Sequence, residues 1–228
     1  IINDEFCLYY QPKINVISGQ ILAVEALARW QHPLLGILSP NEFLSLIEND
    51  DELSSQFNYW VISQAIIQLK QWQQDGLYIK ICVNISQREF KHKEFMEKIN
   101  KIFSDNQTSL DLLSYLEFEI LETVTIENLN KSNKIIQECK SLGITFALDD
   151  FGTGSSSLMH LKELEIDTIK IDRTFVSGMM DNSEDMAIIK AVVGLANAFD
   201  ISVTAIGAEK IEQIMSLMEI GCDEIQGY

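Results

Sequence analysis

Short runs of apolar residues recur along the chain, and longer segments with the apolar spacing of helices separate them. Several of the short runs are apolar at every position rather than at alternate ones. This pattern is typical of strands that are buried on both faces of a parallel sheet. The runs that predict strands are residues 6–11, 21–28, 79–84, 116–120, 145–148, 166–171, 201–205 and 223–226.

Helical patterns occupy most of the intervals between these strands. The clearest start signal is Ser39-Pro40-Asn41-Glu42, a capping box with proline in the first turn. Gly143 would end another helix, because glycine adopts the left-handed conformation that follows a helix. Beyond the helix that starts after Ser39, the pattern predicts helices over residues 53–75, 94–103, 127–142, 155–164, 184–199 and 209–220.

About eight strands with intervening helices predict an α/β fold, a (β/α)8 TIM-like barrel formed by a single domain over residues 1–228. Only a short segment containing Asn15 and Ser18-Gly19 separates the first two strands. It is too short for a helical crossover, so the first strand should be antiparallel to the second. The alternative is an open doubly wound sheet, but no glycine-rich phosphate turn follows the first strand.

The net charge of the chain excludes some classes of binding partner. The formal net charge is −17, and a surface this acidic repels nucleic-acid backbones and anionic membrane leaflets. We therefore expect no DNA or RNA partner and no direct membrane contact. An anionic ligand would need metal ions or placed basic groups to bind. Solubility alone is the other explanation of the acidity.

Cysteine use and hydropathy indicate the compartment. Cys7, Cys82, Cys139 and Cys222 lie far apart with no CxxC spacing, so a zinc site is not expected. No apolar run approaches the roughly 20 residues that cross a bilayer. The sequence therefore predicts a cytoplasmic domain, which could belong to a full-length protein that is anchored in a membrane.

Polar side chains gather at the ends of the predicted strands. In a barrel those ends meet at one rim, where barrel active sites form. Each residue alone has an ordinary explanation, such as a turn or a solvated charge, but their joint position predicts a site. The residues are Glu25, Asn84, Glu119, Asp149, Asp150, Lys170, Asp172, Glu209 and Gln226.

Several carboxylates on one rim would repel one another unless cations lay between them. Oxygen ligands of this kind suit Mg²⁺ or Mn²⁺ rather than zinc. Two such ions that share a bridging carboxylate are a recurring arrangement for phosphodiester hydrolysis. The sequence therefore predicts a carboxylate-bound Mg²⁺ or Mn²⁺ centre.

Seven motifs in one order resemble the EAL domain family, and they span residues 9 to 228. A single one would be weak evidence, but seven in register are specific. They are Tyr10-Gln11-Pro12, Glu25-Ala26-Leu27-Ala28-Arg29-Trp30, Val83-Asn84-Ile85-Ser86, Glu119-Ile120-Leu121-Glu122, Leu148-Asp149-Asp150-Phe151-Gly152-Thr153-Gly154, Ile169-Lys170-Ile171-Asp172-Arg173 and Gly221-Cys222-Asp223-Glu224-Ile225-Gln226-Gly227-Tyr228.

The resemblance implies a barrel with an antiparallel first strand and a bacterial phosphodiesterase that opens cyclic di-GMP to linear pGpG. It also assigns roles by position. Glu25, Asn84, Glu119 and Asp149 resemble ligands of a first metal ion, and Asp149 with Asp150 resembles the ligands of a second. Lys170 resembles the lysine that holds the attacking water. Gln11, Arg29 and Asp172 resemble ligand contacts. Glu122, Glu209 and Gln226 resemble residues that support the site, and Glu209 and Asp150 also resemble residues that take part in catalysis.

The chain departs from the family pattern after its seventh predicted strand. The family usually reads Ala-Glu-Gly-Val-Glu-Thr, whereas this chain reads Ala205-Ile206-Gly207-Ala208-Glu209-Lys210. The glutamate that Ile206 replaces is assigned in the family as a second-metal ligand or as the general base. Isoleucine can neither ligate a cation nor accept a proton. Losing a general base costs about 10²–10⁴ in rate.

Three functions remain open. The preferred hypothesis is a cyclic di-GMP sensor with weak or absent hydrolysis. The first alternative is an active phosphodiesterase, in which a neighbour such as Glu209 takes over the lost role. The second is a scaffold that binds neither metal nor nucleotide, and the intact Glu25, Asn84, Glu119 and Asp149 argue against it.

The resemblance also implies partners beyond the ligand. A homodimer is expected, with residues 150–157 resembling the loop that couples metal binding to dimerisation. EAL domains are commonly joined to sensory or GGDEF domains. The family continues for a short segment beyond Gly227-Tyr228, so we expect a domain excised from a longer protein and truncated at its C-terminal end.

Overall fold

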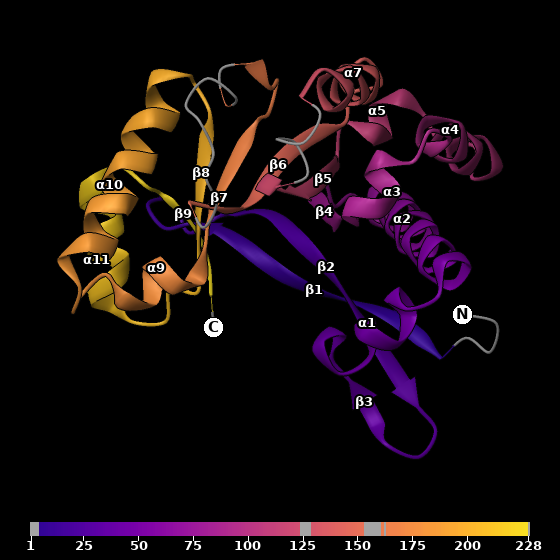
Figure 1. The fold of residues 1–228 in the computed structure, drawn as a ribbon, viewed down its shortest axis with the longest axis horizontal. Helices are drawn as coiled ribbons and strands as arrows, with labels where there is room; N and C mark the ends of the chain where they lie inside the picture. Colours follow the sequence, from indigo (N-terminus) through magenta and orange to yellow (C-terminus); the bar gives the residue numbers. More distant parts are fainter. Residues whose placement is uncertain (1–4, 124–128, 153–160, 162, 228) are drawn as a thin grey trace.

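The computed structural model describes residues 5–123, 129–152, 161 and 163–227, and its nine strands form one sheet that closes on itself (Figure 1). The sheet order is β1-β9-β8-β7-β6-β5-β4-β2-β3, and β1 also pairs with β2, so that every strand except β3 belongs to the barrel. The strands are β1 Phe6–Asn15, β2 Ile21–His32, β3 Gly36–Leu38, β4 Lys80–Asn84, β5 Leu116–Leu121, β6 Thr145–Phe151, β7 Thr168–Ile171, β8 Ser202–Ile206 and β9 Glu224–Gln226.

The first strand runs against both of its barrel neighbours. β1 is antiparallel to β2 and to β9, while the other barrel pairs are parallel. The β1–β2 turn is closed by the Asn15 side chain, whose oxygen accepts hydrogen bonds from the backbone of Ile17 and Ser18. Gly19 follows with a φ of +70°, which favours glycine. The predicted TIM-like barrel with an antiparallel first strand is therefore confirmed.

Helices cover the outside of the barrel in two groups (Figure 1). α2 and α4 lie on one side, and α10 and α11 lie on the other; α1 and β3 form a lobe that projects from the barrel. The helices are α1 Pro40–Glu48, α2 Asp51–Gln74, α3 Gln87–Lys91, α4 Phe95–Asp105, α5 Leu110–Leu113, α7 Leu129–Lys140, α9 Arg173–Gly178, α10 Ser183–Ala198 and α11 Ile211–Ile220.

Most predicted helices are present with shifts of a few residues at their ends. The Ser39 capping box holds, because the Ser39 backbone N–H donates to the Glu42 carboxylate at 2.7 Å. Gly143 ends the segment after α7 with a φ of +96°. The short helices α3, α5 and α9 were not predicted, because single turns carry too little periodicity. Most of the helix predicted over 155–164 lies outside the described residues.

The barrel interior is polar, which the apolar appearance of the strands did not predict. Lys13 on β1 and Glu119 on β5 contact each other, as do Glu25 on β2 and Lys170 on β7. These strands are not neighbours, so their side chains meet only inside the barrel. The side chains that alternate with them, such as Phe118 and Ile169, are buried in the main hydrophobic core. Charged interior positions depart from the branched apolar layers that usually fill such barrels.

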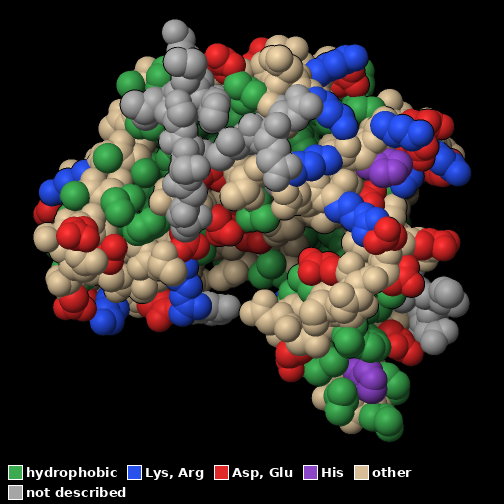
Figure 2. Space-filling model, in the orientation of Figure 1, with side chains coloured by type: hydrophobic (Ala, Val, Ile, Leu, Met, Phe, Trp, Pro, Cys, Tyr) green, Lys and Arg blue, Asp and Glu red, His purple; other side chains and the backbone are tan. Residues whose placement is uncertain are grey.

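Within the described residues, no helix is long and apolar enough to cross a membrane. All four cysteines are free, and only Cys7 is not fully buried. Figure 2 shows hydrophobic side chains on the projecting lobe, where Leu34, Leu35 and Ile37 are exposed.

Candidate active site

Lys170 is the centre of a buried carboxylate group at the carboxyl ends of the parallel strands. Its Nζ lies 2.5 Å from Glu119 Oε2, 2.9 Å from Asp149 Oδ2 and 3.4 Å from Glu25 Oε2. These four side chains come from β7, β5, β6 and β2, and we call them the rim cluster. The structure therefore brings together four of the residues that the strand ends predicted.

Two amides donate hydrogen bonds to the carboxylate oxygens of Glu25. Asn84 Nδ2 donates to Glu25 Oε1 at 2.7 Å, and Gln226 Nε2 donates to Glu25 Oε2 at 2.6 Å. Gln226 also reaches Gln11 Oε1 at 3.2 Å, and Gln11 in turn donates to the Gly227 carbonyl. The predicted Gln11, Asn84 and Gln226 thus extend the rim cluster along one side of the rim.

The rim cluster is buried and carries more negative than positive charge, and burial and the neighbouring charges shift the pKa of its members. Burial and then the neighbouring Glu119 raise the pKa of Glu25 above its usual range. Burial also raises the pKa of Asp149, and together with repulsion from Glu119 it outweighs the attraction of Lys170. Burial would raise the pKa of Glu119 too, but Lys170 and Lys13 lower it to about 2.

Asp150 and its neighbours shape the turn beside the rim cluster. Asp150 has a φ of +55°, a left-handed conformation that few residues other than glycine adopt. Its backbone N–H donates to Asp149 Oδ1 at 2.9 Å. Glu122 is buried and accepts a hydrogen bond from the Gly152 backbone at 3.1 Å. Burial and then Asp172 raise the pKa of Asp150, so Asp150 and Asp172 face each other at the edge of the site.

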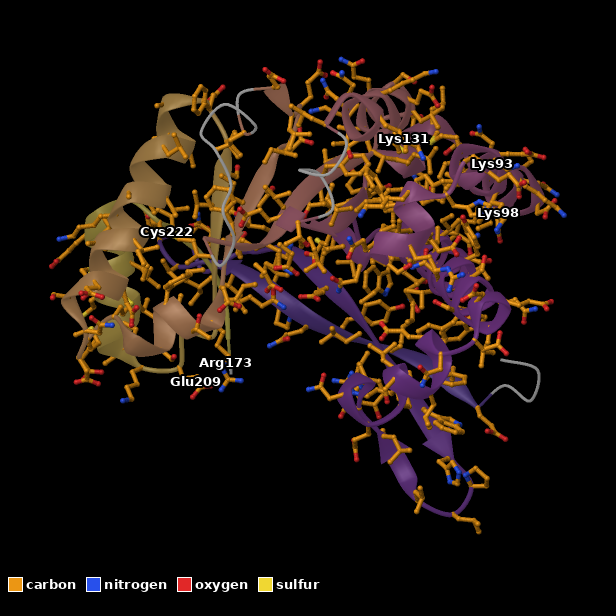
Figure 3. The ribbon with its side chains drawn as sticks, in the orientation of Figure 1. Lys93, Lys98, Lys131, Arg173, Glu209 and Cys222 are labelled. Carbon is orange, nitrogen blue, oxygen red and sulfur yellow. The ribbon has the colours of Figure 1, made fainter. Side chains whose placement is uncertain are left out.

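Three predicted residues lie outside this network. The Glu209 carboxylate is 3.2 Å from Arg173 Nη2, and 46% of its side chain is exposed (Figure 3). Arg29 places its guanidinium over the Tyr9 ring and donates to the Ala28 carbonyl. Ile206 is the last residue of β8 and pairs in register with Gln226. It therefore lies beside Gln226, which donates to Glu25 of the rim cluster.

A second polar group lies below the rim cluster, and the sequence reasoning missed it. Lys13 Nζ contacts Glu117 Oε1 at 3.2 Å and Glu119 Oε1 at 2.8 Å. Lys80 Nζ reaches Glu117 Oε2 at 3.5 Å, and Cys82 donates to Glu117. We call Lys13, Lys80, Cys82 and Glu117 the lower layer. The signal was available, because Lys13 is two residues from Gln11 and Glu117 is two residues from Glu119, on the same face of each strand.

The donor atoms of the rim cluster fit a hard divalent cation. Its three carboxylates (Glu25, Glu119 and Asp149) share the buried Lys170 ammonium, and only Glu119 also contacts Lys13, so the cluster has an excess of negative charge. Gln226 Oε1 is also buried without a hydrogen-bond partner among the described residues. Carboxylate and amide oxygens are preferred by Mg²⁺ and Mn²⁺.

The lower layer is a poorer metal site. Cys82, Glu117 and Glu119 each offer an atom close enough to share one cation. However, the Lys13 ammonium already bonds both carboxylates of this group. A cation there would have to displace a buried ammonium, so the rim cluster is the better metal site.

An apolar cavity adjoins the rim. It has a volume of about 420 Å³ and lies between α1, α2 and the ends of β2 and β4. Asn84 and Leu121 belong to its lining together with Leu44, Ile47 and Phe57. A cavity with a largely apolar lining beside a polar rim suits an aromatic ring system. In Figure 2 acidic side chains are visible in the hollow at the middle of the view.

Comparisons with known proteins agree with this geometry. A model of the EAL domain family matches residues 1–228. The chain is 37% identical over 227 residues to the uncharacterised protein sll1895 of Synechocystis, covering 99% of this chain and 32% of that protein. It is 34% identical over 225 residues to the cyclic di-GMP phosphodiesterase PA2567 of Pseudomonas aeruginosa, covering 99% of this chain and 38% of that protein.

A solved structure is similar over the same range. The structure of the PaMucR phosphodiesterase in complex with c-di-GMP superposes with a TM-score of 0.92 at 32% identity, covering 99% of this chain and 90% of that chain. The chain spans only 26–38% of the length of the first curated relatives that it matches.

Proposed function

The chain belongs to the EAL domain family, and from that premise we propose that it binds cyclic di-GMP at the rim cluster and hydrolyses it slowly or not at all. The observation that carries this proposal is the convergence of Glu25, Glu119 and Asp149 on the single Lys170 ammonium. A site with this excess of negative charge cannot bind a phosphodiester unless a cation lies between them.

We propose that Mg²⁺ or Mn²⁺ is that cation. Glu25, Asn84, Glu119 and Asp149 would hold a first ion, and Asp149 with Asp150 a second. When bound, such ions act as Lewis acids that offset the negative charge of the reacting phosphate. The raised pKa of Glu25 and Asp149 supports this reading, because neighbouring negative charge that a cation would neutralise contributes to both shifts.

The ligand contacts follow from the remaining groups. Gln11 lies at the polar side of the rim, and Arg29 is held over Tyr9 beside it. Asp172 faces Asp150 at the opposite edge. We propose that these three contact the nucleotide and that one guanine lies in the apolar cavity. Support comes from PaMucR, whose structure was determined with c-di-GMP.

Hydrolysis would join one water oxygen to a phosphorus atom and break one bond from that phosphorus to a ribose 3′ oxygen. The leaving oxygen takes up a proton, and the product is linear pGpG. Lys170 is the residue best placed to orient the water, because its ammonium lies within 3.4 Å of three carboxylates at the site centre. The proton released by the water needs a carboxylate acceptor.

The proposal of slow hydrolysis depends on the positions of Ile206 and Glu209. Ile206 occupies the end of β8 beside Gln226, where the family has a glutamate. Glu209 is directed to Arg173 at a half-exposed position, which does not favour its taking over the lost role. A missing proton acceptor costs about 10²–10⁴ in rate.

The runner-up is an active phosphodiesterase. Relatives over nearly the whole chain carry that name, including RocR of Pseudomonas aeruginosa at 35% identity. The rim cluster itself is intact. A non-binding scaffold is disfavoured, because such a protein has no physical reason to bury three carboxylates around one ammonium.

Partners beyond the ligand remain proposals. MucR, a relative at 34% identity, is named a bifunctional diguanylate cyclase and phosphodiesterase. We propose a comparable fusion of this domain to GGDEF or sensory domains, with a homodimer and a cytoplasmic location. Most of the 150–157 segment expected to couple metal and dimer lies outside the described residues.

Two measurements on the purified domain test the proposal. Calorimetry with cyclic di-GMP and Ca²⁺ should show binding, and chromatography after incubation with Mg²⁺ or Mn²⁺ should show little pGpG. Rapid pGpG formation would replace the sensor by the active phosphodiesterase. Absence of binding at high nucleotide concentration would favour the scaffold.

A further inference from the structure

Lys13 is among the most buried charged residues of the chain, at 2% exposure, yet it lies at neither the rim nor the surface. It projects from β1 into the barrel, directly below the rim cluster. Its Nζ donates to Glu119 Oε1 at 2.8 Å and to Glu117 Oε1 at 3.2 Å. Burying an ammonium is costly unless its partners are well placed, so the position calls for a physical reason.

Glu119 is held from two sides. Lys13 bonds Oε1 from below, and Lys170 bonds Oε2 from the rim at 2.5 Å. The side chain is fully buried, with 0% exposure. Its carboxylate therefore cannot rotate without breaking a buried ion pair. Only Oε2 is turned toward the rim cluster.

Charge balance for Glu117 does not by itself explain Lys13. Glu117 has another cation, because Lys80 Nζ lies 3.5 Å from Oε2. Thr145 and Cys82 donate to Glu117 as well. Glu119 Oε1, by contrast, receives its ammonium contact from Lys13. The shorter of the two Lys13 contacts is also the one to Glu119.

We propose that Lys13 is a positioning residue that fixes the Glu119 carboxylate, so that Glu119 offers Oε2 alone to a divalent cation. This inference rests on the proposed function and deepens it. Groups that orient a metal ligand from behind typically contribute 10–100-fold in metal affinity or activity. Lys13 would act in this way without touching the metal or the nucleotide.

The test compares Mn²⁺ binding among matched variants. Electron paramagnetic resonance and calorimetry measure the binding. Lys13→Met removes the ammonium. The double variant Lys13→Met/Glu117→Gln removes one buried negative charge with it, and it keeps the test open if the single variant does not fold. Lys80→Met is the control, because Lys80 touches Glu117 but not Glu119. Ile66→Ala, in the distant core of α2, controls for a general loss of stability.

We expect the Mn²⁺ dissociation constant to rise by roughly 10–100-fold in both Lys13 variants and to stay unchanged in Lys80→Met and Ile66→Ala. Cyclic di-GMP binding in EDTA should be undetectable in all of them, because the site needs a cation to accept the phosphodiester. Equal or tighter Mn²⁺ binding by the Lys13 variants would overturn the positioning role. So would an equal loss in Ile66→Ala. If the wild type itself bound no Mn²⁺, the proposed function would fail first, and the two failures are thus distinguishable.

Discussion

The rim cluster and the lower layer are adjacent inside one barrel, but their charges are balanced differently. In the lower layer, Glu117 has ammonium groups on both sides, from Lys13 and Lys80. Burial would raise the pKa of Glu117, yet these lysines lower it. In the rim cluster, three carboxylates share Lys170. Burial raises the pKa of two of them, Glu25 and Asp149, and the shared ammonium does not offset this effect.

The difference separates two uses of buried charge. A balanced group stabilises one arrangement of side chains and has no need of a further ion. An unbalanced group stores electrostatic repulsion that a bound cation relieves, and such imbalance is typical of functional sites. Glu119 belongs to both, because one of its oxygens faces each group.

The largest effect is expected from Lys170→Met, which removes the only ammonium of the rim cluster. Whatever slow hydrolysis the wild type retains should become undetectable, because water positioning and charge stabilisation are lost together. The metal-free protein should lose about 3–5 kcal/mol of unfolding free energy at neutral pH. Product chromatography and urea unfolding measure the two effects. Lys80→Met replaces a partly exposed lysine and should change neither hydrolysis nor stability strongly. A similar loss of stability in Lys80→Met and Lys170→Met would contradict the difference between the two layers.

Ile206→Glu should increase the activity of the site by supplying the missing carboxylate. Turnover of cyclic di-GMP with Mn²⁺ should rise by about 10² or more, since a general base contributes this much. Ile206→Gln is the matched control, because it has a similar length and no basic site. Initial rates of pGpG formation by the two variants and the wild type measure this effect. No gain in the glutamate variant would show that Ile206 does not limit the rate.

Two amide substitutions compare the layers directly. Glu119→Gln should weaken Mn²⁺ binding by at least about tenfold, because a ligand oxygen loses its charge. Glu117→Gln should leave Mn²⁺ binding intact and cost about 1–3 kcal/mol of stability, because it weakens buried hydrogen bonds to charged groups. Calorimetry and thermal unfolding separate the outcomes. Equal metal affinity in the two variants would contradict the division into a metal site and a structural layer.

The smallest effect is the pH dependence of the metal-free protein. Because folding raises the pKa of Glu25 and Asp149, the folded state binds their protons more tightly, and stability should increase as pH falls from neutrality through those raised values. Glu119 acts in the opposite direction, since its pKa is lowered to about 2 and its contribution is lost as pH falls below the ordinary range toward that value.

Thermal unfolding in EDTA should therefore give a higher Tm at roughly pH 5.5 than at neutral pH. Saturating Mn²⁺ should reverse this order, because the cation binds the deprotonated carboxylates. Asp149→Asn should flatten the EDTA profile and is the control for the general effect of the −17 net charge. A Tm in EDTA that rises steadily toward neutral pH would contradict the raised pKa of Glu25 and Asp149.

Much of the molecule was predictable from local patterns. The barrel followed from alternating strand and helix signals, and the antiparallel first strand followed from the short segment around Gly19. Glu25, Glu119, Asp149 and Lys170 were predicted to meet because the carboxyl ends of parallel strands share one rim. These inferences succeed because backbone propensity and strand direction are encoded within a few neighbouring residues.

The sequence by itself determined the fold class, the family motifs and the replacement of a glutamate by Ile206. Only the tertiary structure decided which oxygen of Glu119 meets which lysine, that Glu209 turns to Arg173, and that Lys13 and Glu117 form a layer below the rim. The reason is physical. Which strand faces which across a closed barrel depends on how all of the strands stagger and tilt together, and no local pattern contains that information.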